Sequence, residues 1–565
     1  MMKRTFIPDN FKADDKAQVT EYYQRLLQED IPQNARSLRD WILRWNELST
    51  VLSEASARRY VAMTSHTQDE KIAKAYMDFV REIDPVCEDY GNKLERKMME
   101  HPSVAELESE FGIYFRDVRT SLSLFNPKNI PLFTEESTDI QDYQKITSTM
   151  SVQYKGETKT LPQMSALFTS TDRDVREEAW KLVTNRRLED KERLDNAFDR
   201  LFKLRIQIAK NSGYSDYLDY IFKAKSRFDY TPRDCRTFHE SIEKIILPYL
   251  RDIYRKKASA MKLERLRPWD AKADALSREP LKPFQKGSEL IEKVGLIFDR
   301  LSPKTSAYFR TLKDEHLIDP DSRVGKAPGG YQIGFEESGK PFIFMNAAGT
   351  DGDIYTLLHE SGHSFQQFEV AKLPLTAYHD IPSEFAEVSS MSMELIGSTD
   401  LSPFYPNHED AKRSRASELE EIIWLFPWVA SIDSFQHLLY SHPNHTASDR
   451  KEMWLSVMDR YDAGIDYSGF EDAKSYLWQK QLHLFEVPFY YIEYGIAQLG
   501  ALQVYANFRK NPQKALDDLF AAEALGSSRP LPELFARANI RFDFSRETIE
   551  PLIRDVCDEL STLES

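Results

Sequence analysis

The residues best suited to chemistry lie in the stretch Leu358-His-Glu-Ser-Gly-His-Ser-Phe365. His359 and His363 are four positions apart, so on an α-helix both imidazoles lie on one face and can bind a single metal ion. Glu360, beside the first histidine, can then reach a water molecule at that ion and act as a general base. The spacing predicts a zinc site with its base on one helix, and a pair of surface histidines is the alternative.

The neighbouring residues favour a helix at this motif. Thr350, Asp351 or Asp353 can cap its start, and an apolar stripe follows. Gly362 inside such a helix costs about 1 kcal/mol relative to Ala. We therefore expect another segment of the chain to pack closely against Gly362.

A second predicted helix, which begins at Pro382 or Ser383, supplies candidates for a further metal ligand. A catalytic zinc site normally has three protein ligands and one position for water. Glu384, Glu387 and Glu394 share one face of this helix. Position alone does not choose between Glu384 and Glu387, and a solvated acidic stripe is the alternative for all three.

Residues 483–495 form a third set, rich in aromatic side chains. Tyr hydroxyls and an imidazole can donate hydrogen bonds to an oxyanion that develops during hydrolysis of an amide. Tyr491 and Tyr494 are three apart and face the same side if the stretch is helical, and His483 precedes them. An aromatic run of this kind is also typical of core packing.

Other histidines and the cysteines predict no further site. The histidines at 437, 442 and 445 surround a Pro-Asn turn, which favours a surface loop over a second metal site. The three cysteines are far apart and odd in number, so they indicate neither a disulfide framework nor a Cys-based zinc site. These cysteines are Cys87, Cys235 and Cys557.

The elements that position these residues are predicted to be mainly helical. Only 20 of 565 residues are glycine, and helical periodicity covers Asp15 to about Met99 and Asp172 to Ser259. A further helix is expected over 286–301. A short hairpin is expected at 151–161, and a small strand pair between Val324 and Gly349, beside the chemistry. We divide the chain into an N-terminal helical region, 1–150, and a helical catalytic region, 151–565.

The composition of the chain indicates which classes of partner and which cellular location to expect. The formal charge of -16, without a long basic stripe, argues against a nucleic-acid surface. The stretch Met1–Lys12 lacks the apolar core of a signal peptide. The most apolar segment, Ile422–Ile432, is interrupted by Pro427 and is shorter than the ~20 residues of a membrane span. We expect a cytoplasmic protein that binds neither nucleic acid nor membrane.

The two predicted site helices resemble those of the thimet oligopeptidase and oligoendopeptidase F family of zinc peptidases. The residues that carry the resemblance are His-Glu-Ser-Gly-His at 359–363 and Phe-Ala-Glu-Val-Ser-Ser-Met-Ser-Met-Glu at 385–394. The similarity extends over about 172–550 and is strongest to the bacterial oligoendopeptidase F and Pz-peptidase branch. It implies one Zn2+ ion per chain held by His359, His363 and Glu387, with Glu384 and Glu394 in supporting roles.

The resemblance also implies a fold and an activity. The fold is mainly α, with a deep channel between two helical halves and a small β element near the zinc site. The activity is zinc-dependent endopeptidase cleavage of short oligopeptides, with Glu360 as the base. His483, Tyr491 and Tyr494 correspond to the substrate-binding His and Tyr positions of the family.

Further residues are candidates for holding the substrate. The backbone of Asn346, Ala347 and Gly349 is expected to pair with the peptide as an added strand, and Gly329 and Gly330 to form a mobile loop over it. A zinc exopeptidase, of dipeptidyl carboxypeptidase or carboxypeptidase type, is the alternative on the same scaffold. A helical binding protein with a zinc site but no turnover is an alternative from another class. Oligomeric state and residue preference stay open.

Overall fold

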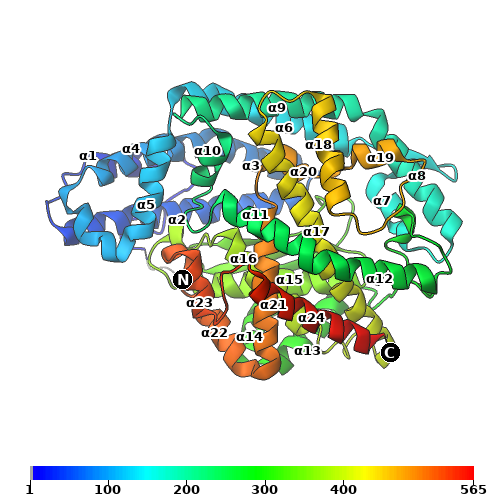
Figure 1. Cartoon of the computed structure of the whole chain (residues 1–565). Helices are drawn as coiled ribbons and strands as arrows, with labels where there is room; N and C mark the ends of the chain where they lie inside the picture. Colours follow the sequence, from blue (N-terminus) through cyan, green and yellow to red (C-terminus); the bar gives the residue numbers. More distant parts are fainter. Residues whose placement is uncertain (1–3, 565) are drawn as a thin grey trace. The chain divides into compact units, whose positions relative to one another are not determined.

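A computed structural model describes residues 4–564 and shows a chain built almost entirely of helices (Figure 1). The residues form two compact units, each assembled from three stretches of the chain. Unit 1 contains the residues up to Leu122, Lys282–Ala411 and Ala497–Phe542, and unit 2 contains Ser123–Leu281, Lys412–Ile496 and the residues from Asp543 onward. The division of the sequence at residue 150 stays a prediction.

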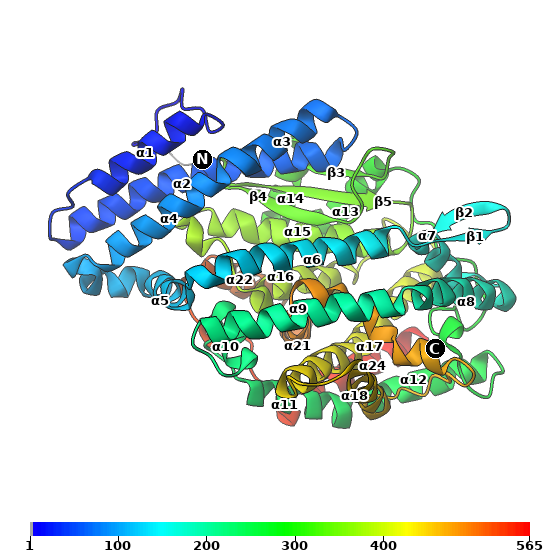
Figure 2. The same cartoon turned by 90° about the horizontal axis from the view of Figure 1, so that it is seen from above.

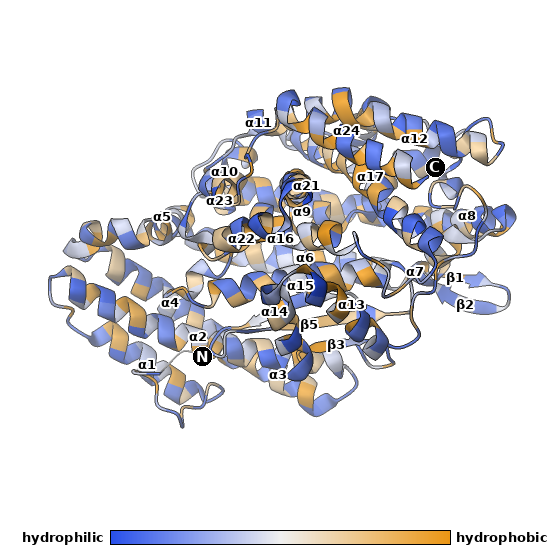
Figure 3. Ribbon diagram, turned by 90° about the horizontal axis from the view of Figure 1, so that it is seen from below, coloured by the Kyte–Doolittle hydropathy of each residue, from blue (hydrophilic) through white to orange (hydrophobic). Residues whose placement is uncertain are grey.

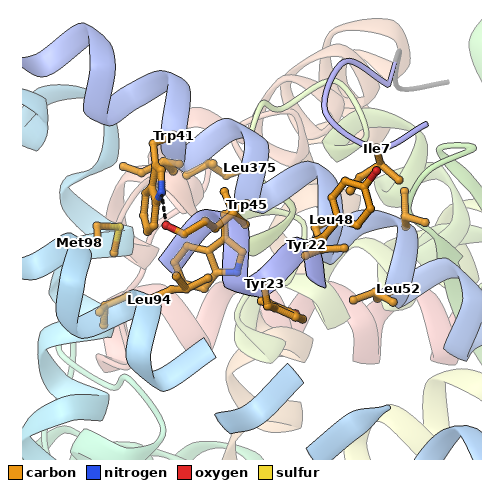
Figure 4. Close-up of a cluster of buried hydrophobic side chains, with 14 of the residues drawn as sticks. Ile7, Tyr22, Tyr23, Trp41, Trp45, Leu48, Leu52, Leu94, Met98 and Leu375 are labelled. Atoms are coloured by element: carbon orange, nitrogen blue, oxygen red, sulfur yellow. Dashed lines mark hydrogen bonds between the residues drawn. The ribbon is translucent and has the colours of Figure 1, made fainter. Parts of the chain in front are cut away.

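Unit 1 begins with four helices, as the periodicity over 15–99 predicts. They are α1 (Lys16–Gln28), α2 (Ala35–Ser65), α3 (Glu70–Glu82) and α4 (Asp84–Met99). Apolar side chains of α1, α2 and α4 form a buried cluster in which the Trp41 indole donates a hydrogen bond to the Leu26 carbonyl at 3.0 Å (Figure 4). Leu375, from the segment between the two candidate site helices, belongs to the same cluster. Burial of each such large side chain contributes roughly 1.5–3 kcal/mol, so the cluster anchors that segment.

The other helices of unit 1 include the two candidate site helices. They are α13 (Gly287–Leu301), α14 (Pro303–Asp314), α15 (Gly352–Val370), α16 (Ser383–Gly397), α22 (Pro512–Glu523) and α23 (Leu531–Arg537). The helices α5 (Glu108–Leu124), α17 (His408–Ser441) and α21 (Ile492–Lys510) contain residues of both units. The helix predicted over 286–301 is therefore confirmed as α13.

Unit 2 is also helical, in agreement with the prediction for 172–259. Its helices are α6 (Ile130–Ser148), α7 (Leu161–Ser165), α8 (Arg173–Glu189), α9 (Lys191–Asn211), α10 (Tyr217–Ala224), α11 (Pro232–Ser241), α12 (Leu247–Ala260), α18 (Ala447–Arg460), α19 (Glu471–Ser475), α20 (Leu482–Glu486) and α24 (Arg546–Leu563). A helix such as α24 carries hydrophilic and hydrophobic residues together, as expected of a helix with one buried face (Figure 3). Over residues 4–564, no helix has both the length and the apolar character needed to cross a membrane.

The predicted hairpin at 151–161 is present. Strands β1 (Ser151–Tyr154) and β2 (Glu157–Thr160) pair in antiparallel register, with Ser151 opposite Thr160. Lys155 and Gly156 between them both have positive φ, at 50° and 84°. Two successive residues with positive φ are typical of the tight turn that joins two twisted strands.

The second sheet lies in unit 1 and has three strands in the order β3, β5, β4. They are β3 (Ile318–Asp321), β4 (Tyr331–Phe335) and β5 (Lys340–Ala347). Figure 2 shows them next to α15. The predicted pair is confirmed, although β4 begins only at Tyr331 and residues 327–330 form a loop. Strand β3 was not predicted because its sequence, Ile-Asp-Pro-Asp, has a single β-branched residue beside Asp and Pro, which are depleted in strands. The mainly α fold with a small β element beside a site helix is confirmed.

Candidate active site

The two predicted site helices, α15 and α16, lie side by side (Figure 1). At the start of α15, one carboxylate oxygen of Asp353 accepts hydrogen bonds from the backbone N–H groups of Thr350 at 2.8 Å and Ala348 at 2.9 Å. Pro382 occupies the capping position of α16. The sequence signals for both helix starts are therefore correct to within a residue or two.

Gly362 is the point at which α15 approaches α16. A Cβ atom added to Gly362 would lie 2.6 Å from Ser390 Cα, 2.8 Å from the Ser389 carbonyl oxygen and 2.9 Å from the Ser390 nitrogen. All three atoms belong to the backbone of α16. The expectation that a segment packs closely against Gly362 is confirmed, and only glycine allows this approach.

Two residues that the sequence analysis did not single out support this contact. The fully buried Ser389 hydroxyl lies 3.1 Å from the Gly362 carbonyl oxygen and 2.6 Å from a carboxylate oxygen of Glu523, the last residue of α22. Burial raises the pKa of Glu523 to about 8, with a smaller opposing effect of the Ser389 hydrogen bond. A buried carboxyl thus adjoins the serine that bridges the two helices.

Three of the predicted metal ligands converge at this helix contact. The Nε2 atoms of His359 and His363 lie 3.3 Å and 3.6 Å from the same Glu387 carboxylate oxygen. All three donor atoms lie within 4.8 Å of one another. Two ligands of a tetrahedral zinc ion, each bonded at ~2.0–2.1 Å, are about 3.3–3.4 Å apart. The donor types and their separations therefore fit a zinc ion.

The remaining two carboxylates on this face of α16 have different surroundings. Glu394 lies 2.6 Å from His359 Nδ1, so a proton on Nδ1 donates to this carboxylate and leaves Nε2 as the free donor atom for a metal. Glu384 is buried in the first turn of α16. Spacing left Glu384 and Glu387 open as the third ligand, whereas the geometry places Glu387 against both imidazoles.

The electrostatics of the site favour a cation. Burial opposes a charge on His359, but the carboxylates of Glu394, Glu387 and Glu360 outweigh it and raise the pKa of His359 to about 10. For Glu387, burial alone would raise the pKa of the carboxyl group. The two histidines and the hydroxyl of Ser390 have the larger, opposite effect and lower this pKa to about 2. Three acidic groups around two imidazoles make the local potential negative, which stabilises a bound cation.

Glu360 lies beside these donors and is only 8% exposed. Burial raises the pKa of its carboxyl group, and the neighbouring His359 and His363 oppose this effect. A carboxylate with a raised pKa is suited to accept a proton and return it near neutral pH. The arrangement can therefore combine a metal ion with a proton carrier.

The predicted substrate-binding residues lie in the same unit. The Asn346 side chain donates hydrogen bonds to the carbonyl oxygens of Ala327 at 2.8 Å and Gly329 at 2.7 Å. It thus holds the loop that contains Gly329 and Gly330. Ala347 ends β5, and Gly349 has a positive φ of 83°.

Strand pairing around Asn346 and Ala347 bears on the predicted mode of substrate addition. β5 lies between β3 and β4, which are the two edges of the sheet, and its pairing with β4 ends at Phe344, before Asn346 and Ala347. Pairing of a peptide with the backbone of Asn346, Ala347 and Gly349 stays a prediction. A pocket of about 420 Å³ is formed by α2, the loop of residues 327–330 and β4. Its lining residues are Tyr60, Thr64 and residues 327–333.

The predicted His and Tyr residues gather in unit 2. The ring of His483 lies 4.8 Å from that of Tyr491 and 5.8 Å from that of Tyr494, and the two tyrosine rings are 5.5 Å apart. Tyr491 precedes α21 and Tyr494 lies in its first turn, so the two are not on one regular helix. Tyr490, which the sequence analysis did not single out, stacks on His483 at 5.8 Å.

His483 and Tyr491 are neutral hydrogen-bonding groups near pH 7. Burial lowers the pKa of His483 to about 4, with a smaller contribution from the positive charge of Lys225. Burial raises the pKa of Tyr491 to about 12. The His and Tyr group and the His and Glu group belong to different units, so their assignment to one active site stays a prediction.

Comparison with known protein families shows to which class of protein this chain belongs. The model of peptidase family M3 matches residues 166–552, and that of the peptidase M3 N-terminal domain matches residues 6–125. The chain belongs to peptidase family M3. This is a family of metallopeptidases, and the predicted resemblance to its oligoendopeptidase F branch is confirmed.

Solved structures and curated relatives agree with this placement in family M3. Pz peptidase A is 27% identical and superposes with a TM-score of 0.89, and a putative oligoendopeptidase F from Bacillus anthracis is 25% identical with a TM-score of 0.85. Both alignments cover 99% of each chain. An oligoendopeptidase F homolog of Borreliella burgdorferi is 23% identical over 57% of this chain, which spans 56% of that relative's length. The chromosomal oligoendopeptidase F of Lactococcus lactis is 34% identical over 20% of this chain and 18% of its own length.

Proposed function

We propose that this M3 family member is a zinc-dependent endopeptidase that hydrolyses internal peptide bonds of short oligopeptides. The observation that carries the proposal is the convergence of His359, His363 and Glu387 on one point, with Glu360 beside them. Family membership supports a peptidase. The names of the relatives, oligoendopeptidase and oligopeptidase, favour internal cleavage of short peptides over removal of terminal residues.

The chain's own residues have separate tasks in this proposal. A zinc ion held by His359, His363 and Glu387 would polarise the scissile carbonyl and make a water molecule more acidic. Glu360 takes the proton from the attacking water and transfers it to the nitrogen of the leaving amine. Glu394 keeps the proton of His359 on Nδ1, so that Nε2 would be free to bind the metal.

The His and Tyr residues are proposed to stabilise the reacting peptide. His483, Tyr491 and Tyr494 would donate hydrogen bonds to the oxyanion or orient the peptide backbone. Burial keeps the Tyr491 hydroxyl protonated, and a protonated phenol is a hydrogen-bond donor. Loss of a true oxyanion donor costs about 10² to 10³ in turnover.

The small sheet is proposed to hold the peptide in an extended conformation. A backbone segment without a neighbouring strand offers N–H and C=O groups to an extended peptide, and the pairing of β5 with β4 ends at Phe344, before Asn346. The backbone of Asn346, Ala347 and Gly349 is proposed to pair with the peptide, and the Asn346 side chain holds the loop of Gly329 and Gly330 that would cover it. The channel that restricts substrates to short peptides and the cytoplasmic location stay predictions.

Peptides of increasing length, blocked at both ends, test the proposal. We expect mass spectrometry to show cleavage at internal bonds, loss of cleavage with a chelator and its return with Zn2+. Products that differ from the substrate only by one or two terminal residues, seen only with unblocked peptides, would instead identify an exopeptidase. Cleavage that a chelator leaves unchanged would refute the metal-dependent mechanism.

A further inference from the structure

We propose that Cys235, Asp433 and His437 bind a second zinc ion inside unit 2. Cys235 lies on α11, and Asp433 and His437 lie on α17. One donor atom from each of these residues lies within 4.8 Å of the other two. Cys235 and Asp433 are fully buried, and His437 is 8% exposed.

The two helices present matched pairs of metal-binding residue types. Cys235 and His239 are four apart on α11, and Asp433 and His437 are four apart on α17, so each pair lies on one face of its helix. The Nε2 atom of His239 lies 2.8 Å from an Asp433 carboxylate oxygen. His239 is therefore positioned to form a hydrogen bond that orients the carboxylate of Asp433 for metal binding.

Two buried atoms of this cluster lack the hydrogen bonds that buried polar atoms normally make. Within residues 4–564, neither Asp433 Oδ1 nor His437 Nε2 has a hydrogen-bond partner. The Nε2 atom of His437 lies 3.3 Å from Asp433 Oδ2, within ion-pair distance. Asp433 Oδ1 carries lone pairs that a metal ion would accept, and so does His437 Nε2 when the ring proton is on Nδ1.

The charges of the donor set match a divalent cation. A thiolate at Cys235 and a carboxylate at Asp433 supply two negative charges, which a zinc ion neutralises, so the bound site carries no net charge. Neutrality matters here because an uncompensated charge is costly at a fully buried position. Cys235, Asp433 and His437 together would supply three protein ligands, each of a type that binds zinc.

Apolar and aromatic surroundings separate this site from water. The rings of Phe489 and His239 lie 5.4 Å and 5.6 Å from the ring of His437. A metal site closed to solvent is typical of a structural role rather than catalysis. We assign the second ion to holding α11 against α17.

The predicted surface loop is wrong for His437, because the structure buries His437 in α17 and leaves His442 exposed beyond the helix end. The spacing of the cysteines predicts no Cys-based zinc site. In the proposed site the partners of Cys235 are an aspartate and a histidine from a distant part of the chain.

Cobalt substitution tests the proposal, because a thiolate bound to Co2+ gives a charge-transfer absorption in the near ultraviolet. Since the candidate active site has no sulfur donor, this band reports Cys235 alone. The full chain is produced in zinc-depleted medium with cobalt and analysed for metal content and absorption. We expect the wild type to hold two Co2+ ions per chain and to show the band.

Variants assign the band to its ligand. Cys235→Ser is expected to lose the band and one of the two ions, whereas the matched controls Cys87→Ser and Cys557→Ser keep both. His363→Ala is expected to lose one ion and keep the band, which separates the two sites. A wild-type chain with one ion and no band overturns the proposal, whether or not any variant folds. A band that persists in folded Cys235→Ser overturns it as well.

Discussion

Because α15 and α16 are in close contact at Gly362, we expect Gly362→Ala and Gly91→Ala to change the stability of the folded chain in opposite directions. Gly362→Ala adds a methyl group 2.6 Å from Ser390 Cα, where ordinary contact begins at 3.4 Å, so the helices must separate by about 3.4 − 2.6 = 0.8 Å. Gly91→Ala, in α4, adds the same group where nothing lies within 4 Å. Both substitutions relieve the cost of glycine in a helix, about 1 kcal/mol.

The expected magnitudes follow from these two surroundings. Gly91→Ala should stabilise the folded chain by roughly 0.5–1 kcal/mol. At Gly362 the overpacking cost of about 1–3 kcal/mol offsets or exceeds the gain in helix propensity, so Gly362→Ala should destabilise the folded chain by up to about 2 kcal/mol. Because metal-ligand distances tolerate shifts of only about 0.2 Å, the separation of His363 from Glu387 should also weaken zinc binding by at least about tenfold.

Two measurements check this prediction. Denaturant unfolding of both variants and the wild type reports stability, and competition with a chromogenic chelator reports zinc affinity. If Gly362→Ala is stabilised as much as Gly91→Ala and keeps wild-type zinc affinity, the close approach at Gly362 does not shape the metal site.

Three further predictions concern acidic residues. Glu360→Gln should keep its zinc, measured by metal analysis, but lose turnover by about 10² to 10⁴, and wild-type turnover would exclude Glu360 as the base. Glu387→Ala should lower zinc content more than Glu384→Ala or Glu394→Ala, and equal losses in all three would refute the ligand assignment. Glu523 has a folded-state pKa of about 8 against 4.5 in a model peptide, so its contribution to stability is full below pH ~4.5 and is lost as pH rises through ~8. Between pH 5 and pH 9 the wild type should therefore lose roughly 2–4 kcal/mol of unfolding free energy through Glu523, and Glu523→Gln should not show this loss. The same pH dependence of stability in the variant and the wild type would contradict this prediction.

Local spacing in the sequence determined much of the candidate site. The four-residue step between His359 and His363 requires only one helix, because the pitch of the helix places such residues on one face. The same reasoning located α16, its acidic face and the close contact at Gly362. Helical periodicity likewise predicted the mainly α fold, and the Lys155-Gly156 turn predicted the hairpin.

Tertiary structure decided the points that depend on packing between distant segments. Glu384 and Glu387 lie on the same face of α16, so only the position of α15 shows that Glu387 meets both imidazoles. Strand β3 has only one strand-favouring residue, Ile318, and forms because β5 offers it a partner. Cys235 and His437 are about 200 positions apart, and no periodicity along the chain relates them. Spacing along one element specifies which residues share a face, whereas burial energy summed over the whole core selects which faces meet.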